Sequence, residues 1–302
     1  MRSDNLKIKI EFNQVYIMNI IAIDVGSYML DGGAIFGVVP KSLWSKVYPA
    51  DETNLCRLQL RCLLLVTGNR RILIDTGIGN KQDEKFYAHY FRTGTDKLVQ
   101  SLKEAGYLAE MITDVIFTHL HFDHCGGAFR KEANGTTMDI FPRATYWVSR
   151  QQWELSLMPN AREKASFLKE NIQPLADSGK LQLVEKQGEF LPGIDLQFFN
   201  GHTAGQMIPF IRTGGRTMVY VADLLPFSAH IPLAWVCGFD THPLVSMSEK
   251  EIFLREALEG NYCLFFEHDH FVECCDLQVT EKGIRMKNSF SLADWKEGVV
   301  PA

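Results

Sequence analysis

The segment VIFTHLHFDHCGG at 115–127 constrains the fold and the chemistry of this chain more than any other. It begins as an apolar, strand-like run and ends in two glycines. Between them stand four side chains that can bind a metal, namely His119, His121, Asp123 and His124. Imidazole and carboxylate groups suit Zn²⁺, Fe or Mn, and layered α/β proteins place ligands at the carboxyl ends of strands. The segment therefore predicts a metal site at the end of a buried strand, and a chance cluster of histidines in a polar loop is a poor alternative.

Strand-like and helix-like stretches alternate along the whole chain. Strands are expected at 6–12, 15–23, 58–66, 71–75, 115–118, 181–185, 194–199, 217–223 and 262–266, and helices at 96–105, 151–157, 161–175 and 248–258, the last capped by Ser248. This alternation predicts a layered α/β protein. We expect a single domain at 18–302 after an N-terminal extension at 1–17. Met18 as the true start is a hypothesis that the intact mass of natively expressed protein would test.

Charge and cysteine content narrow the partners and the compartment. The chain has 31 Lys and Arg against 36 Asp and Glu, a formal net charge of −5, which argues against a basic face for nucleic acid or an anionic membrane. No apolar run reaches the roughly 18 residues of a membrane helix, and the N-terminus does not resemble a signal peptide. The seven cysteines lack C-x-x-C spacing, as suits reduced thiols. We therefore expect a cytoplasmic protein that acts on a small molecule, with no nucleic-acid or membrane partner.

The H-x-H-x-D-H pattern resembles the signature of the metallo-β-lactamase superfamily, and four further motifs occur in the order of that family. They are ILIDTG at 72–77, NGHTAGQ at 200–206, VYVAD at 219–223 and FFEHD at 265–269. Together the motifs extend the resemblance over roughly residues 20–288. The resemblance implies an αββα sandwich, in which two mixed β-sheets pack face to face, helices lie outside, and the metals sit at one edge.

Carried over residue by residue, the resemblance implies two divalent metal ions, zinc above all, with Mn, Fe or Co as alternatives. The first ion is expected on His119, His121 and His202, and the second on Asp123, His124 and His268, with Asp223 bridging the two. Such a pair lowers the pKa of a bridging water and polarises the bond to be cleaved, so that a bridging hydroxide attacks. Asp123 is also expected to act in catalysis by passing a proton to the leaving group.

Three other polar residues are candidates for a role at or near the metal site. Asp75, in the D-T-G motif, is expected to orient a ligand histidine from outside the metal site, with turn formation as its alternative. His270 competes with His268 for the last ligand position, and the family pattern favours His268. His230 follows Asp223 by seven residues in an apolar loop and is a candidate catalytic residue.

Three loops resemble the branch of the superfamily that holds quorum-quenching acyl-homoserine lactonases and methyl parathion hydrolase. They are LDGGAIFGVVP at 30–40, LLPFSAH at 224–230 and FDTHPL at 239–244. Aromatic residues on Gly- and Pro-rich loops would wall an apolar pocket, with core packing as the alternative, and we expect this of Phe36, Phe227 and Trp235. The chain departs from the lactonases in one respect.

That departure is the lack of a tyrosine shortly after the bridging aspartate, where acyl-homoserine lactonases often place one to assist the carbonyl oxygen. The departure favours a broader ester or phosphotriester hydrolase over a strict lactonase. His230 would then stand in for the missing donor.

The function expected from these features is metal-dependent hydrolysis of a small, largely apolar ester or lactone, with acyl-homoserine lactones as candidate substrates. The alternatives on the same fold are a glutathione-thioester hydrolase, a phosphotriester hydrolase and a di-iron sulfur-oxidising enzyme. A metal-stabilised binding protein without activity is the alternative outside enzymes, and the complete ligand set argues against it. The apolar loops would suit a homodimer.

Overall fold

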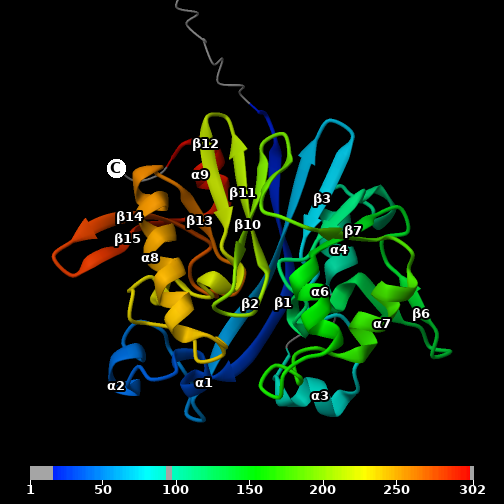
Figure 1. Cartoon of the computed structure of the whole chain (residues 1–302), viewed down its shortest axis with the longest axis horizontal. Coiled ribbons are helices and arrows are strands. Elements are labelled where there is room, and N and C mark those ends of the chain that lie inside the picture. Colours follow the sequence, from blue (N-terminus) through cyan, green and yellow to red (C-terminus); the bar gives the residue numbers. More distant parts are fainter. Residues whose placement is uncertain (1–15, 93–96, 300–302) are drawn as a thin grey trace, which may run out of the picture.

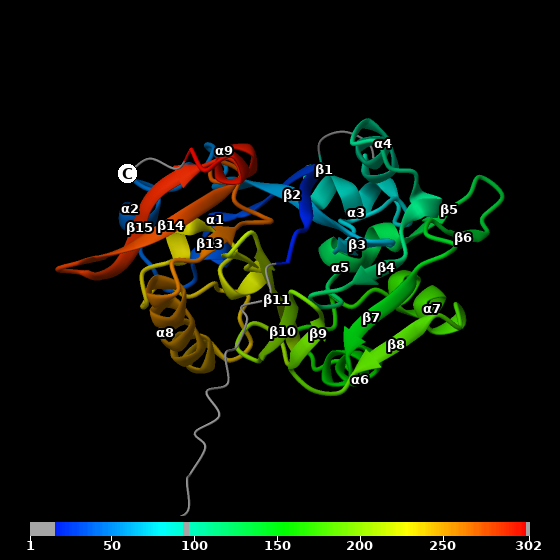
Figure 2. The same cartoon turned by 90° about the horizontal axis from the view of Figure 1, so that it is seen from above.

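The computed structural model describes residues 16–92 and 97–299 (Figure 1). Two β-sheets pack face to face, and helices cover their outer faces (Figure 2). This arrangement confirms the αββα sandwich that the sequence predicts. Within the described ranges, no helix is both long and apolar enough to cross a membrane.

The first sheet is mixed. Its strands, in spatial order, are β1 (Asn19–Asp31), β2 (Leu55–Thr67), β3 (Arg70–Ile74), β4 (Asp114–Ile116), β7 (Thr145–Ser149) and β8 (Leu181–Val184). β1, β2 and β3 pair antiparallel, whereas β3, β4, β7 and β8 run parallel. Side chains alternate between the two faces of a strand. On β2, Leu63 and Leu65 therefore enter the core between the sheets, while Leu64 enters the core under the helices.

The second sheet is mixed as well. Its strands, in spatial order, are β15 (Gly283–Phe290), β14 (Cys274–Thr280), β13 (Cys263–Phe265), β12 (Arg216–Tyr220), β11 (Gln206–Thr213), β10 (Ile194–Phe199) and β9 (Gly188–Leu191). Neighbouring strands are antiparallel except for β12 and β13, which are parallel. β5 (Phe129–Lys131) and β6 (Thr137–Asp139) form a separate hairpin.

The helices differ greatly in length. They are α1 (Gly32–Phe36), α2 (Lys41–Trp44), α3 (Glu84–His89), α4 (Leu98–Glu104), α5 (Phe122–Cys125), α6 (Arg150–Leu157), α7 (Lys169–Asp177), α8 (Pro243–Glu259) and α9 (Leu292–Glu297). α8 lies along the outer face of the second sheet, and α4, α6 and α7 lie outside the first (Figures 1 and 2).

The structure corrects one predicted helix and one predicted cap. The helix expected at 161–175 forms only as α7. The side chain of Asn160 accepts hydrogen bonds from the backbone N–H groups of Arg162 and Glu163, as an N-cap would, but the turns that follow do not continue as a helix and α7 begins only at Lys169. α8 begins five residues before Ser248, because Pro243 suits the first position of a helix.

Two further predictions concern strand ends and the N-terminus. The strand expected at 217–223 ends at Tyr220, and Asp223 lies in a short 3₁₀ turn at Ala222–Leu224. The strand expected at 6–12 and most of the extension at 1–17 lie outside the described residues. The described part of that extension includes Tyr16, whose carbonyl accepts a hydrogen bond from the N–H of Gly214.

The loops that follow the parallel strands meet at one edge of the sandwich. β3 and β4 are parallel neighbours in the first sheet, as are β12 and β13 in the second, so their carboxyl ends point the same way within each sheet. The turn after β3 packs tightly on the loop after β4. A Cβ at Gly126 would lie 1.9 Å from the carbonyl oxygen of Ile78, so only glycine permits this approach.

Candidate metal centre

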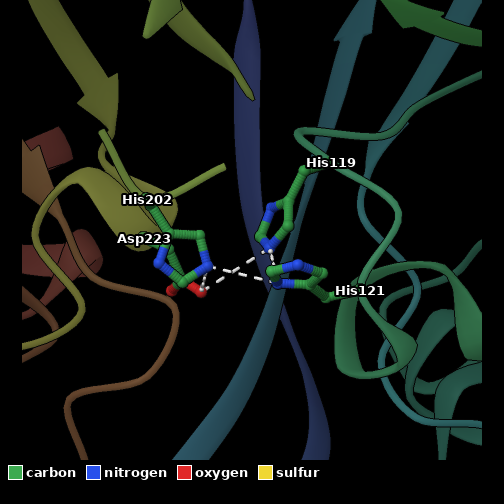
Figure 3. A group of neighbouring side chains, drawn as sticks. All are labelled: His119, His121, His202 and Asp223. Carbon is green, nitrogen blue, oxygen red and sulfur yellow. Dashed lines mark hydrogen bonds and ion pairs between the residues drawn. The ribbon is translucent and has the colours of Figure 1, made fainter. Parts of the chain in front are cut away.

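Seven side chains that can bind a metal gather at this edge, four from the segment that follows β4 and three from the segments that follow β10, β12 and β13. His119 and His121 approach from one side, and His202 and Asp223 from the other (Figure 3). The remaining three are Asp123, His124 and His268. All seven are at most 8% exposed. The structure thus brings together every side chain that the family resemblance offered as a ligand.

The first group consists of His119, His121, His202 and Asp223. Nδ1 of His121 lies 3.0 Å from Nε2 of His119 and 3.2 Å from Nε2 of His202. Oδ2 of Asp223 lies 3.1 Å from Nε2 of His202 and 3.6 Å from Nε2 of His119. The donor atoms lie within 4.8 Å of one another. Three imidazoles and one carboxylate this close together match the ligand set of a single ion.

The second group consists of Asp123, His124 and His268. Nε2 of His268 lies 3.2 Å from Nε2 of His124 and 3.8 Å from Oδ2 of Asp123. Asp223 reaches this group too, because its Oδ1 lies 3.3 Å from Nε2 of His268. Asp223 therefore turns one oxygen toward His202 and the other toward His268, as a bridging carboxylate would.

The outward-facing nitrogens of these histidines have polar partners of their own. Nδ1 of His202 lies 3.0 Å from Oδ1 of Asp240, and Nδ1 of His268 lies 3.1 Å from the carbonyl oxygen of Gln59. Such partners fix the tautomer and the orientation of a ligand histidine. Asp240 was not among the residues expected at the site, although it lies in the FDTHPL segment.

His124 has two acidic neighbours on its outer side. Its Nδ1 lies 3.1 Å from Oδ2 of Asp75 and 3.1 Å from Oε2 of Glu267. Asp75 also accepts hydrogen bonds from the backbone N–H and the hydroxyl of Thr118, at 2.8 and 2.7 Å. Asp75 is thus placed to orient a ligand histidine. Sequence reasoning missed Glu267, which only its place directly before His268 could have suggested.

The buried carboxylates set the electrostatics of the site. Although burial acts in the opposite direction, Asp223 and Asp240 raise the pKa of His202 to about 10. Against the same effect of burial, Asp223 and Glu267 raise the pKa of His268 to about 9. These carboxylates favour positive charge here, so the same field favours a bound cation.

The residues present fit two divalent ions. Imidazole and carboxylate donors suit Zn, Mn, Fe or Co. Oδ1 of Asp223 is buried and has no hydrogen-bond partner within the described residues. A buried oxygen left in this state is costly, and a cation between Asp223 and the neighbouring histidines would satisfy it.

A cavity of about 400 Å³ opens onto the metal centre. Its floor includes His121, Asp123, His202, Asp223 and His268. Much of its wall is apolar, with contributions from Leu30, Ile35, Leu58, Phe122, Phe227 and Phe239. Arg162 is the one Lys or Arg among the described residues that line it. The cavity therefore suits a small molecule with an apolar portion.

The expected pocket residues take different places. Phe227 lines the cavity, whereas Phe36 and Trp235 are not among the described residues that do. The ring of Phe36 is fully buried and stacks on Trp44, with centroids 4.9 Å apart. Trp235 instead borders a separate cavity beside α8. Phe36 is therefore a core residue, which was the alternative to a pocket residue.

His230 lies behind the cavity wall. Its ring packs against both Phe36 and Phe227, at centroid distances of 5.1 and 5.5 Å. It is 1% exposed and is not among the described residues lining the cavity. Burial, aided by the charge of Lys250, lowers its pKa to about 3. A neutral ring in this position contacts the wall, and a direct catalytic role for His230 stays a prediction without structural support.

A tyrosine does reach the metal centre, but from another part of the chain. Tyr28, on β1, lines the cavity and donates a hydrogen bond of 2.6 Å from its hydroxyl to Oδ2 of Asp123. The family pattern places a tyrosine after the bridging aspartate, whereas Tyr28 lies far upstream of Asp223 in the sequence. Nothing in the local pattern around Tyr28 distinguishes it from an ordinary strand residue.

Comparisons with known proteins agree with this geometry. The model of the metallo-β-lactamase superfamily matches residues 57–259. An N-acyl homoserine lactonase of Bacillus cereus is 29% identical over 233 residues, which cover 72% of this chain and 83% of the relative. A protein of Staphylococcus aureus described as a probable metal-dependent hydrolase is 31% identical, with a TM-score of 0.84, and the match covers 92% of this chain and 98% of the other.

A more distant solved structure shows the same fold. AidC, a dizinc quorum-quenching lactonase in complex with a product, has a TM-score of 0.75 and 23% identity, and the match covers 92% of this chain and 96% of AidC. The superfamily model spans two thirds of the present chain and includes six of the seven converging side chains. The chain therefore belongs to the metallo-β-lactamase superfamily and is a hydrolase of that family.

Proposed function

We propose that this protein is a metal-dependent lactonase, and that its substrates are acyl-homoserine lactones or closely similar small lactones. The observation that carries the proposal is a cluster of seven buried side chains that can bind a metal, five of which form the floor of a largely apolar cavity of about 400 Å³. The lactonase relatives support the same assignment.

The chemistry requires water activation and charge stabilisation at one place. Two divalent ions held at this floor would lower the pKa of a water molecule and polarise the lactone carbonyl. His119, His121 and His202 would hold one ion, and Asp123, His124 and His268 the other. Asp223 would be shared, since its two oxygens face different groups.

Lactone hydrolysis also requires a proton for the leaving group. The oxygen of water adds to the carbonyl carbon, the ring C–O bond breaks, and the ring oxygen becomes a hydroxyl group after it gains a proton. Asp123 lines the cavity beside His268. Its carboxyl group is therefore placed to carry that proton from the attacking water to the ring oxygen.

The cavity wall favours this substrate class over a glutathione thioester. Glutathione carries two carboxylates, yet Arg162 is the single Lys or Arg among the described lining residues. An acyl chain instead needs apolar contacts, which Leu30, Phe227 and Phe239 provide. A phosphotriester hydrolase or a di-iron sulfur-oxidising enzyme would use the same metal ligands. These alternatives differ from a lactonase in the substrate that is turned over or in the metal that supports the activity.

A hydrolysis panel tests the proposal. Protein reconstituted separately with Zn²⁺, Mn²⁺ and Fe²⁺ is offered acyl-homoserine lactones, simple γ- and δ-lactones, aryl esters, a phosphotriester and a glutathione thioester. We expect lactone turnover well above the ester background. His119→Ala should abolish it, whereas His89→Ala, at an exposed histidine on α3, should not. Turnover of the thioester or phosphotriester without lactone turnover would refute the proposed substrate class.

A further inference from the structure

We infer that Tyr28 is a positioning residue that fixes the carboxylate of Asp123 and thereby secures the second of the two metal ions. This inference rests on the proposed dinuclear centre and deepens it, because nothing in the ligand motifs points to β1. It assigns a function to a side chain that lies 95 residues before its partner in the sequence.

The contact itself is short and buried. The Tyr28 hydroxyl lies 2.6 Å from Oδ2 of Asp123, and Tyr28 is 1% exposed. A hydrogen bond to a charged oxygen is stronger than one between neutral groups. The bond holds one oxygen of Asp123 on the side of β1 and leaves Oδ1 to face His124, whose Nε2 lies 3.9 Å away.

The ring of Tyr28 also contacts another residue of the group formed by Asp123, His124 and His268. Tyr28 packs edge-on against His268, with ring centroids 6.1 Å apart. Tyr28 therefore supports Asp123 by a hydrogen bond and His268 by ring packing. Neither contact involves His119, His121 or His202, so the support is confined to one half of the centre.

An irregularity in β1 aims Tyr28 at the site. The pairing of β1 with β2 shifts between Asp24 and Gly26, which leaves Val25 as an extra residue. Gly26 adopts a φ of +123°, which a residue with a Cβ rarely adopts. A one-residue insertion reverses which face each later side chain occupies.

The reversal can be followed in the packing. Ile23 lies before the shift, and Tyr28 and Leu30 lie after it, yet all three pack on the same side of the first sheet. Without the extra residue, Ser27 and Met29 would point to the cavity in place of Tyr28 and Leu30. The extra residue in β1 therefore turns the phenol ring of Tyr28 toward Asp123.

Tyr28→Phe tests the inference by removing only the hydroxyl. The matched control is Tyr90→Phe, because Tyr90 lines the same cavity and packs edge-on against Tyr28 at 6.4 Å. No hydrogen bond from the Tyr90 hydroxyl is found within the described residues. The readout is the number of Zn²⁺ ions retained per chain, and their affinities, during titration with a chelator.

We expect wild type and Tyr90→Phe to retain two ions. Tyr28→Phe should hold the first ion normally and the second about 10- to 100-fold more weakly, the usual effect of losing a partner that orients a ligand. Asp123→Ala should also weaken the second ion, and adding Tyr28→Phe to it should weaken that ion little further, since the hydroxyl then has no carboxylate to fix. Circular dichroism should show that all variants remain folded.

Three results would contradict these expectations, and they can be told apart. Equal affinities for both ions in Tyr28→Phe and wild type would overturn the inference alone. Equal weakening of both ions by Tyr28→Phe would also overturn it, because the effect would then be general. A wild type that binds fewer than two ions would overturn the proposed centre together with the inference.

Discussion

Nδ1 of His202 lies 3.0 Å from Oδ1 of Asp240, a residue 38 positions further along the chain. Asp240 is buried and lies in the loop that precedes α8. Its neighbour Phe239 lines the cavity. One short loop thus orients a residue of the metal centre and forms part of the substrate wall, which couples the position of the metal to the shape of the cavity.

Asp240→Asn should weaken metal binding at the first group. The amide can still accept a hydrogen bond but lacks the charge that makes His202 a better donor to a metal. We expect a loss of metal affinity of about 10-fold or more, measured by chelator titration. Asp195→Asn is the control, because Asp195 pairs with Arg212 instead of a histidine. Unchanged affinity in Asp240→Asn would show that the contact does not tune the metal.

The candidate metal ligands can be recognised in the sequence more readily than the residues around them. His119 and His124 belong to a compact motif after a strand, and a local pattern of this kind is visible without a structure. Tyr28 and Glu163 reach the site through long-range packing, which no local pattern records. Glu163 lies 3.6 Å from Nε2 of His121, in a stretch that the periodicity assigned to a helix.

The pocket prediction was limited by the same cause. Aromatic residues on Gly- and Pro-rich loops can face either a cavity or the core, and the sequence does not distinguish the two. Phe227 faces the cavity and Phe36 packs against Trp44. The choice depends on how α1 and the loop after β12 pack on each other, and this is a property of the assembled fold.

Phe239→Ala should reduce the activity on long acyl chains selectively. Phe239 lines the cavity and is 42% exposed, so its loss should remove apolar contact without opening the core. We expect kcat/KM to fall by about 3- to 10-fold for a decanoyl substrate, as loss of about 1 kcal/mol of apolar contact predicts, and little for a butanoyl substrate. Phe271→Ala, at an exposed residue that does not line the cavity, is the control. An equal loss on both chain lengths would contradict an acyl-binding role.

Lys250→Met should change how stability depends on pH. Lys250 is 1% exposed, and its Nζ donates to the carbonyl oxygens of Pro232, Leu233 and Trp235 at 3.2, 3.3 and 2.7 Å. Burial lowers its pKa from 10.5 to about 8. Between these two values the unfolded chain binds more protons than the folded chain, so this lysine makes folding more favourable as the pH rises.

The free energy of unfolding of wild type, relative to Lys250→Met, should therefore increase from about pH 8 to about pH 10.5, by up to about 3 kcal/mol. At pH 7 the variant should be less stable, because three carbonyl groups lose a donor. Urea titrations at several pH values measure both effects, and Lys85→Met, at an exposed lysine, is the control. A pH-independent difference would mean that Lys250 has an ordinary pKa.

His230→Leu separates a catalytic role from a packing role. Loss of a general acid or base typically costs about 10²- to 10⁴-fold in rate. Because the ring lies behind Phe227 and outside the cavity lining, we expect kcat on lactones to change by less than about 3-fold, well short of that loss. His89→Leu, at an exposed histidine, is the control. A loss of 100-fold with both metals still bound would instead support the catalytic role expected from the sequence.

The same substitution should remove an acid-sensitive part of the stability. The folded pKa of His230, about 3, lies below the ordinary value of 6.5, so below pH 6.5 the unfolded chain takes up a proton that the folded chain does not. Wild type should thus lose stability from this residue as the pH falls from 6.5 toward 3. His230→Leu lacks the group and should lose less over that range, which denaturant titrations at pH 7 and pH 5 would show. Equal losses in both proteins would place the ring in a more polar environment than its packing against Phe36 and Phe227 indicates.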